Sequence, residues 1–500
     1  MDDAPARRRL ASIASSVASG APFAPSAAAA PAPSKAALLA LRKKHFCDAQ
    51  SISYENTAPL LLVRGEGCRL YDEHGTAYLD TRNNVAHLGH CHAAVVEAVR
   101  VQVGEINTNT RYLHPNVVTL AAELSATMPR SPRGREHDLS KVLFVNSGSE
   151  ANDLALRLAR AHTGGDEHIV VERAYHGHTV AAVGISPYKF EHKGGEGRPP
   201  STHVVPCPDT FRGAFRDEAT AGALYADHVA RACEAAAARR QHAERTLTAG
   251  GVASGGGVSA FFVESGMSVA GVILPPPGYL ARCYEAVRAA GGVCVADEVQ
   301  TGLGRFGEHF WGFQQQGVVP DIVTVGKPFG NGMPLACVIT TPAIAASFTN
   351  GLEYFNTFGG NPVCAAAGLA VLRTIAAEDL QGRARRTGEY LRRRIGEMSS
   401  RFPLLGDVRG AGLFLGIEFV QPGSARPQAP AAAECSVVCS WLKDEHRILT
   451  SIDGAHDNVI VLKPPMVFGE AEADELCNAL ESVLSQLGEI DASSVSHTPT

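Results

Sequence analysis

Two short apolar runs, each followed by one charged residue, constrain the fold of this chain most strongly. The run Val293–Ala296 leads to Asp297, and the run Ile322–Val325 leads to Lys327, 30 residues further along. Such runs are typical of strands buried on both faces of a parallel sheet, and the spacing matches one strand–crossover–strand unit. Because ligands in open α/β sheets bind outside the carboxyl ends of strands, we expect both charged residues to face one small molecule.

A lysine and a carboxylate at neighbouring strand ends suit one cofactor chemistry. Burial lowers the pKa of a lysine, so its amine becomes able to form a Schiff base with an aldehyde. A carboxylate beside a pyridine nitrogen keeps that nitrogen protonated and makes the ring an electron sink. Taken singly, Asp297 is more simply a turn cap and Lys327 a solvated loop residue. The pair predicts a pyridoxal 5'-phosphate site in which both residues are catalytic.

A second motif indicates where the phosphate of such a cofactor binds. The apolar run Lys141–Val145 predicts a buried strand, and it is followed by Asn146–Asn152 and then a helical pattern. A strand, a small glycine-bearing turn and a helix together present free N–H groups and the positive end of a helix dipole to an anion. Gly148 lets the backbone approach closely, and Glu150 is interpreted as a helix cap. The motif is weak alone, because many helices start with Ser-Gly-Ser.

Two further strand ends carry candidate site residues. Tyr175 follows the predicted strand His168–Val171 and is placed to stack on a flat ring, although an ordinary core aromatic residue fits equally well. Glu264 ends the predicted strand Ala260–Val263. Strands alternate with helices from about residue 141 to 341, which predicts a parallel sheet covered on both faces.

Composition excludes several classes of protein. The net charge of −6 gives no indication of nucleic-acid or membrane binding, and no apolar run approaches the length of about 20 residues that spans a bilayer. The twelve cysteines include no CxxC pair, which favours reduced thiols over a disulfide scaffold. The tract His87–His92 holds three histidines, but no second segment supplies ligands at metal-site spacing, so we predict a loop lining a pocket and no metal.

The N-terminal segment is poor in core-forming residues. Residues 1–35 are mostly Ala, Ser and Pro with Arg7–Arg9, a composition typical of disorder and also found in organellar transit peptides. Asp2 and Asp3 weigh against a transit peptide. A cytoplasmic and a mitochondrial location both stay open.

With Asn146–Asn152, Asp297–Gly302, Lys327 and the loop around Thr357 identified, the chain resembles the class III (ω-type) aminotransferases over roughly residues 36–488. The resemblance implies the α/β fold-type I architecture of pyridoxal-phosphate enzymes, with a mixed, mostly parallel sheet flanked by helices and a smaller α+β domain. The predicted parts are a tail (1–35), the N-terminal part of the small domain (36–85), the cofactor-binding large domain (86–375) with a flexible glycine-rich insertion (246–259), the C-terminal part of the small domain (376–488) and a second tail (489–500).

The resemblance also implies roles for single residues. Lys327 resembles the Schiff-base lysine, and Asp297 resembles the partner of the pyridine nitrogen. Thr357 resembles a threonine that reaches the phosphate of the neighbouring subunit, which implies a homodimer or a dimer of dimers with shared active sites. Glu264 and Arg409 resemble a pair that gates the substrate carboxylate. The remaining cofactor contacts implied are Val299 and Tyr175 on the two ring faces, Gln300 near the ring hydroxyl, Ser147, Gly148 and Ser149 at the phosphate, and His176.

Within the family, four segments resemble the phospho-lyase branch, whose members act on ethanolamine phosphate or 5-phosphohydroxy-L-lysine. These segments are Asn83–His87, Asn107–His114, Ile185–Phe190 and Lys463–Met466. Two positions depart from that branch: Thr301 is the residue that true aminotransferases usually carry, and Met333 replaces an expected histidine. The alternative is a transaminase that moves an amino group from a donor such as alanine to a 2-oxo acid such as glyoxylate.

Phosphate elimination and transamination both use Lys327 in the same way, so the residues around it do not distinguish the two reactions. A substrate phosphate needs cations of its own. The candidates are Arg111, Lys189, Arg212 and Lys463. A third hypothesis, a non-catalytic scaffold that kept the fold, is disfavoured by the complete cofactor set.

Overall fold

The computed structural model describes residues 34–54, 59–246, 256–425 and 427–487. The chain divides into two compact units, Met1–Leu61 and Leu62–Thr500. The predicted C-terminal tail, nearly all of the N-terminal tail and most of the predicted insertion 246–259 lie outside the described residues. The predicted insertion extends too far, because Val258 and Ser259 belong to a buried strand.

In the described part of the first unit, the chain forms the short helix α2 (Lys35–His45). The Ser34 hydroxyl caps it by accepting a hydrogen bond from the Ala37 amide at 3.3 Å. The guanidinium of Arg42 donates to the Gln50 carbonyl at 2.7 Å, which ties the helix to the chain that follows.

The second unit is built on a mixed sheet with the strand order β4-β10-β9-β8-β7-β5-β6. The pairs among β9, β8, β7, β5 and β6 are parallel, whereas β10 runs antiparallel to both of its neighbours. The strands are β4 (Lys141–Val145), β5 (Glu167–Val171), β6 (Thr202–Val205), β7 (Val258–Glu264), β8 (Val293–Asp297), β9 (Ile322–Val325) and β10 (Ala336–Thr340).

The mostly parallel sheet is therefore confirmed, but the expectation that every strand from 141 to 341 is parallel is wrong for β10. The physical reason is the length of the connection. Only the single turn η3 (Lys327–Gly330) and a short loop separate β9 from β10. A parallel return needs a crossover of a dozen or more residues, so the chain turns back antiparallel instead.

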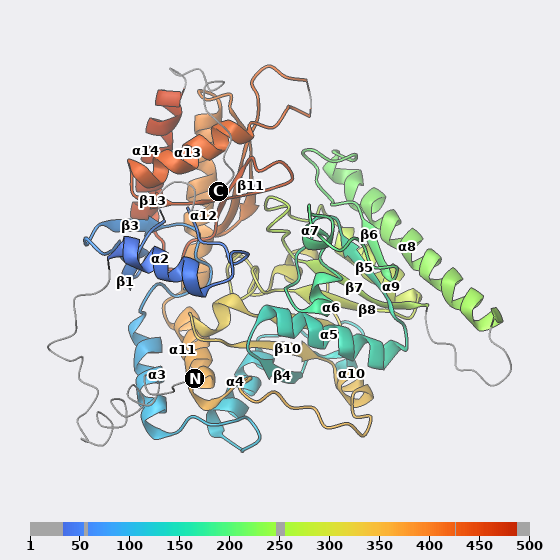
Figure 1. Ribbon diagram of the computed structural model, residues 1–500. Helices are drawn as coiled ribbons and strands as arrows, with labels where there is room; N and C mark the ends of the chain where they lie inside the picture. Colours follow the sequence, from blue (N-terminus) through green and yellow to red (C-terminus); the bar gives the residue numbers. More distant parts are fainter. Residues whose placement is uncertain (1–33, 55–58, 247–255, 426, 488–500) are drawn as a thin grey trace, which may run out of the picture. The chain divides into compact units, whose positions relative to one another are not determined.

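Helices cover both faces of the sheet, as Figure 1 shows for α8 and α9 along one side. Side chains alternate between the faces. Phe261 of β7 packs in a cluster with α8 (Glu218–Thr246) and α9 (Tyr279–Ala289), whereas its neighbour Phe262 packs with α5 (Gly148–Thr163). Burial on both faces explains why these strands have continuous apolar sequences.

Two smaller sheets complete the second unit, in the orders β1-β2-β3-β13 and β11-β12-β15-β14. β13 pairs in parallel with β3 through Ile448 and Leu79, so segments from opposite ends of the chain share one sheet (Figure 1). The predicted bounds of a large and a small domain stay a prediction. The strands are β1 (Leu62–Glu66), β2 (Arg69–Asp72), β3 (Ala77–Asp80), β11 (Leu405–Ala411), β12 (Phe414–Phe419), β13 (Ile448–Leu449), β14 (Ser451–Asp453) and β15 (Val459–Leu462).

The remaining elements are α3 (Ala93–Glu105), α4 (Pro115–Ala126), η1 (Arg135–His137), α6 (Val180–Val183), α7 (Pro187–Phe190), η2 (Gly312–Gln316), α10 (Pro342–Ser347), α11 (Pro362–Ala377), α12 (Leu380–Ser399), α13 (Ala432–Asp444) and α14 (Glu470–Leu487). In the described ranges, no helix combines the length and apolarity needed to cross a membrane.

Candidate active site

A cavity of about 340 Å³ lies where strands β7 and β8 end, beside the start of α5. Strand register explains the place: Glu264 pairs with Asp297, and Asp297 pairs with Thr324, so three strands end at one level. The next turn of chain after Thr324 brings Lys327 to the same edge. The predicted cofactor contacts that line this cavity are Ser147, Gly148, Ser149, Tyr175, His176, Glu264, Asp297, Val299, Gln300 and Lys327.

The carboxylate of Asp297 is buried, with 4% of the residue exposed, and both of its oxygens are held. Oδ1 accepts a hydrogen bond from the Val299 amide at 3.1 Å. Oδ2 accepts one from Asn152 Nδ2 at 2.8 Å and lies 2.8 Å from His176 Nδ1. These contacts fix the direction in which the carboxylate faces the cavity.

Asn152 is a site residue that the sequence reasoning missed, although it belongs to the predicted phosphate motif. Its amide nitrogen also donates to the His176 carbonyl at 2.8 Å, and its amide oxygen accepts from Thr324 Oγ1 at 2.8 Å. It therefore links α5, β9 and the segment after β5 around Asp297. The signal that would have found it is its place one helical turn after Gly148, on the face directed to the strand ends.

The amine of Lys327 meets the demand made on a Schiff-base lysine. In the part of the chain that the structure describes, it has no hydrogen-bond or ion-pair partner. Burial lowers its pKa from the ordinary lysine value, and the negative charges of Asp297 and Glu264 oppose that shift only in part. An amine with a lowered pKa spends more time unprotonated and is a better nucleophile.

The turn before α5 is shaped for an anion. Ser147 caps the helix by accepting a hydrogen bond from the Glu150 amide at 3.2 Å, and the Glu150 carboxylate accepts one from the Asn146 amide at 2.8 Å. Ser147 is thus the cap itself, and Glu150 supports it by accepting from the residue before it, which is the capping role that the sequence predicts. A side chain at Gly148 would place its Cβ only 2.9 Å from Val299 Cγ1, so glycine keeps the space between the turn and the cavity wall open.

Replacing Gly148 with alanine is expected to weaken pyridoxal phosphate binding about 10-fold or more, because overpacking against Val299 costs about 1–3 kcal/mol. Titration of the apoprotein with the cofactor, followed by its visible absorbance, measures this. Gly396→Ala is the matched control: it lies in α12 with no atom within 4 Å of the added Cβ, so cofactor affinity should not change. Equal affinity of the two variants would contradict the role of Gly148.

Glu264 lines the cavity without pairing with Arg409. Its oxygens accept hydrogen bonds from the backbone amides of Tyr175 at 3.4 Å and Ser268 at 3.1 Å. Burial raises the pKa of Glu264 to about 7, and the nearby charge of Asp297 adds to the rise while His176 opposes it. Arg409 lies elsewhere, 2.5 Å from Glu418 and 2.8 Å from Asp407, so the expected glutamate–arginine pair is not formed here.

The proposed substrate cations fall into two groups. Arg212 and Arg409 share the buried carboxylate of Glu418, and Arg111 pairs with Glu353 at 2.6 Å. All three are neutralised by a carboxylate, and none lines the cavity. The ammonium of Lys189 lies over the rings of Tyr188 and Tyr175, at 4.8 and 5.8 Å from their centres.

Lys463 does not line the cavity either, but it hydrogen-bonds to Gln300, which does. Its ammonium donates to Gln300 Oε1 at 3.1 Å and to Ser268 Oγ at 2.8 Å. Asn84 Nδ2 donates to the same Gln300 oxygen at 2.8 Å. The side chain of Gln300, which lines the cavity, is therefore held from two sides.

Thr357 does not line the cavity of its own chain and is exposed. Its carbonyl accepts a hydrogen bond from the Thr110 amide at 3.3 Å, and the Asn356 carbonyl accepts from Thr110 Oγ1 at 2.6 Å. The position leaves the side chain of Thr357 available to a second molecule.

Among the described residues, no group of three or more His, Cys, Asp or Glu side chains gathers as a metal site would require. His87 Nε2 lies 2.8 Å from the Leu303 carbonyl, and His90 Nε2 lies 2.6 Å from Asp80. The adjacent Val85 lines the cavity.

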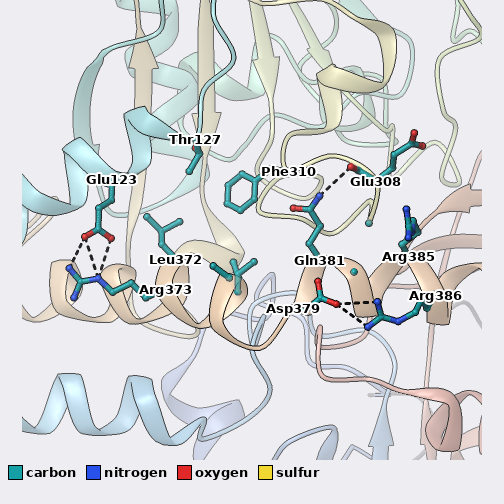
Figure 2. A pocket seen from close by; sticks show the side chains of 14 residues that line it. Glu123, Thr127, Glu308, Phe310, Leu372, Arg373, Asp379, Gln381, Arg385 and Arg386 are labelled. Atoms are coloured by element: carbon teal, nitrogen blue, oxygen red, sulfur yellow. Dashed lines mark hydrogen bonds and ion pairs between the residues drawn. The ribbon is translucent and has the colours of Figure 1, made fainter.

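A larger hollow of about 800 Å³ lies between α4, α11 and the start of α12 (Figure 2). Two ion pairs occupy it, Glu123 with Arg373 at 2.6 Å and Asp379 with Arg386 at 3.1 Å. None of the predicted site residues lines it. We place the chemistry in the smaller cavity, where the unpaired lysine and the buried carboxylate meet.

The residues of the smaller cavity fit pyridoxal phosphate. The turn at Gly148 offers backbone donors in a cradle that a Cβ would fill, and Asp297 offers a fixed buried acceptor. His176 Nε2 is buried without a hydrogen-bond partner among the described residues. Lys327 supplies the free amine. The cavity thus offers a partner for the phosphate, for the ring nitrogen and for the aldehyde of pyridoxal phosphate.

Comparison with known proteins agrees with this geometry. The family model described as aminotransferase class-III matches residues 50–484. Alanine–glyoxylate aminotransferase 2-like from Drosophila melanogaster is 48% identical over 447 residues, covering 88% of this chain and 85% of the relative. Ethanolamine-phosphate phospho-lyase homolog 1 from Caenorhabditis elegans is 37% identical over 464 residues, covering 90% of this chain and 94% of the relative.

Among solved structures, a phospholyase from Arthrobacter in complex with phosphoethanolamine superposes with a TM-score of 0.80. Its sequence identity is 37%, and the match covers 90% of this chain and 99% of the Arthrobacter chain. The likeness therefore extends over the whole catalytic fold and not over one motif.

Proposed function

Since this chain belongs to the class III aminotransferase family of pyridoxal-phosphate-dependent enzymes, we propose that it is a phospho-lyase acting on a phosphorylated primary amine. The substrate is ethanolamine phosphate or 5-phosphohydroxy-L-lysine, and the products are an aldehyde, ammonia and phosphate. The observation that carries the proposal is the single cavity lined by both Lys327 and Asp297. Two relatives at 37% identity, named a phospho-lyase and a phospholyase, support elimination as the outcome.

The proposed cofactor is pyridoxal 5'-phosphate, which when bound supplies an aldehyde to capture the amine and a ring to accept electrons. Asp297 holds the ring nitrogen protonated, and Asn152 and His176 orient Asp297. The turn Ser147–Ser149 binds the cofactor phosphate. Val299 and Tyr175 would pack against the ring, and Gln300 would hydrogen-bond near its hydroxyl, since all three line the cavity.

Lys327 has two tasks in this proposal. Its amine would form the covalent link to the cofactor aldehyde and would give up that place to the amine of the substrate. The released amine then removes the proton from the substrate carbon that bears the nitrogen. The lowered pKa of Lys327 suits the second task, because a base must be unprotonated when the substrate arrives.

The proposed assembly is a homodimer with shared active sites. Large apolar side chains are exposed on two segments that hydrogen-bond to each other through Thr110 and Thr357. The exposed fractions are 92% for Leu113, 79% for Leu352, 69% for Tyr112 and 63% for Phe358. Apolar side chains gathered in this way mark an interaction surface, and a second copy would bring its Thr357 to this cavity. A further pairing of dimers would need a second surface.

The alternative is a transaminase, and one observation favours it. Met333 lines the cavity, so an apolar thioether occupies the wall where the phospho-lyase branch is expected to carry histidine. Thr301 bears less on the choice, because its hydroxyl donates to Glu298 Oε2 at 2.8 Å and does not line the cavity.

Purified enzyme loaded with cofactor is expected to release phosphate and ammonia in equal amounts from ethanolamine phosphate or 5-phosphohydroxy-L-lysine without any 2-oxo acid. Colorimetric phosphate and coupled ammonia assays measure both products. Lys327→Ala is the blank. Absence of release from both substrates, together with turnover of alanine plus glyoxylate, would replace the phospho-lyase by the transaminase.

A further inference from the structure

We propose that Lys463 is the cation that binds the phosphate group of the substrate, at the wall formed by Gln300. The inference rests on the proposed function and adds a residue that selects for phosphate. A phosphate dianion loses its water when it enters a cavity, so it needs a nearby positive charge that is not already neutralised. Only some of the lysines and arginines near the site meet that condition.

Three of the candidate cations already form ion pairs with carboxylates of the protein. Arg212 and Arg409 neutralise Glu418, and Arg111 neutralises Glu353. Moving any of them to a substrate would leave a carboxylate unpaired, which is costly for the buried Glu418. Lys189 has no ion-pair partner in the described ranges, but it is only half-buried, so solvent partly screens its charge. Its ammonium already lies over the rings of Tyr188 and Tyr175.

Lys463 is more deeply buried than Lys189 and is held less closely by a carboxylate than the three arginines. Only 9% of its side chain is exposed, and its two hydrogen bonds go to neutral oxygens, those of Ser268 and Gln300. Its ion pair with Asp453 is long, because the Oδ2 atom lies 3.9 Å away, beyond hydrogen-bond length. An ammonium has three N–H groups, so one remains for a ligand.

Gln300 couples Lys463 to the cavity. Because its amide oxygen accepts from both Asn84 and Lys463, the amide nitrogen points away from them and stays free to donate. The four residues of this network follow β3, β7, β8 and β15, so they come from separated segments of the chain. A network anchored on four strands holds its donors in place before the substrate arrives.

The charge of Lys463 depends on pH. The pKa of Lys463 is lowered to about 8, chiefly by burial and also by the positive charges of Lys327 and Arg305, while Asp453 and Glu264 oppose the shift. The nearest of these groups, Asp453, has a pKa raised by burial to about 6. Phosphate affinity should therefore be high near pH 7 and decrease as the pH rises through about 8, where Lys463 loses its proton.

The test uses inorganic phosphate as the probe and the holoenzyme, in which the cofactor already occupies the turn at Gly148. Isothermal titration at pH 7 compares the native protein with Lys463→Met, which keeps the length of the side chain and removes the charge. We expect the Kd for phosphate to rise about 10- to 100-fold, as for loss of one charged hydrogen bond. Lys189→Met is the comparison variant and should leave the Kd unchanged.

Lys463→Arg provides a readout that a merely structural role would not produce. Arginine stays protonated at high pH, so at pH 9 this variant should bind phosphate more tightly than the native protein does. A general loss of folding cannot improve binding. In steady-state kinetics, Lys463→Met should raise the KM for ethanolamine phosphate. If the enzyme also transaminates alanine, the KM for alanine should stay nearly unchanged, because alanine carries no phosphate.

Three outcomes would overturn the inference: no phosphate binding by the native holoenzyme, an unchanged Kd in Lys463→Met, or a raised Kd in Lys189→Met alone. Failure of the proposed function is a separate result. Phosphate binding that depends on Lys463, without phosphate release from either substrate, would support the anion site and reject the phospho-lyase.

Discussion

Substituting Lys327 by alanine is expected to lower kcat by at least about 10⁴-fold, the upper range for loss of one acid–base group. The loss should be this large because one amine both anchors the cofactor and moves the substrate proton. The visible absorbance of the lysine-bound cofactor should disappear with it. Stopped assays of phosphate release and an absorbance spectrum of the purified variant measure the two effects.

Lys141→Ala is a suitable control for this substitution, since Lys141 is an exposed lysine at the start of β4, away from the cavity. It should retain full absorbance and activity. Lys327→Arg separates charge from chemistry: the guanidinium keeps a positive charge but stays protonated, so it should be as inactive as the alanine variant. Activity within 10-fold of the native enzyme in either variant would reject Lys327 as the reactive amine.

Substituting Asp297 by asparagine is expected to lower kcat about 10²- to 10³-fold, the usual effect of removing one preorganised electrostatic partner. Asparagine has nearly the same shape and can still accept from the Val299 amide. What it lacks is the negative charge that keeps the ring nitrogen protonated. Steady-state kinetics with ethanolamine phosphate and a cofactor titration measure the loss of kcat separately from any loss of cofactor.

Asp379→Asn is the matched control for that change. Asp379 is exposed, pairs with Arg386 in the hollow of Figure 2, and has a left-handed backbone (φ 48°) that asparagine also tolerates. An exposed ion pair contributes little, so activity should stay within about 2-fold. Equal kcat in Asp297→Asn and Asp379→Asn would show that the buried charge has no catalytic role.

Much of the site could be predicted because buried strands can be recognised from short stretches of sequence. The runs before Asp297 and Lys327 are continuous and apolar, and parallel strands end at one edge of a sheet whatever their exact order. The same holds for the turn at Gly148, where a strand, a glycine and a helix are neighbours in sequence. These patterns depend on residues two to four positions apart, which a single sequence displays in full.

The contacts of the charged side chains could not be predicted in that way. Lys463 and Arg212 are equally good candidates for binding a substrate phosphate when only composition and spacing are known. Their difference comes from Glu418, which is 206 residues from Arg212 and yet buried against it. The hydrogen bond from Asn152 to Asp297 depends on how α5 packs on the strand ends, which the local sequence does not specify.

Local patterns in the chain thus specify the strands, the helix starts and the lysine and carboxylate at the strand ends, since those features need only near neighbours. The antiparallel return of β10, the network around Gln300 and the choice of which cation stays free were set by packing. Charge pairing depends on distance in space, and segments hundreds of residues apart acquire that distance only when the sheets and helices assemble.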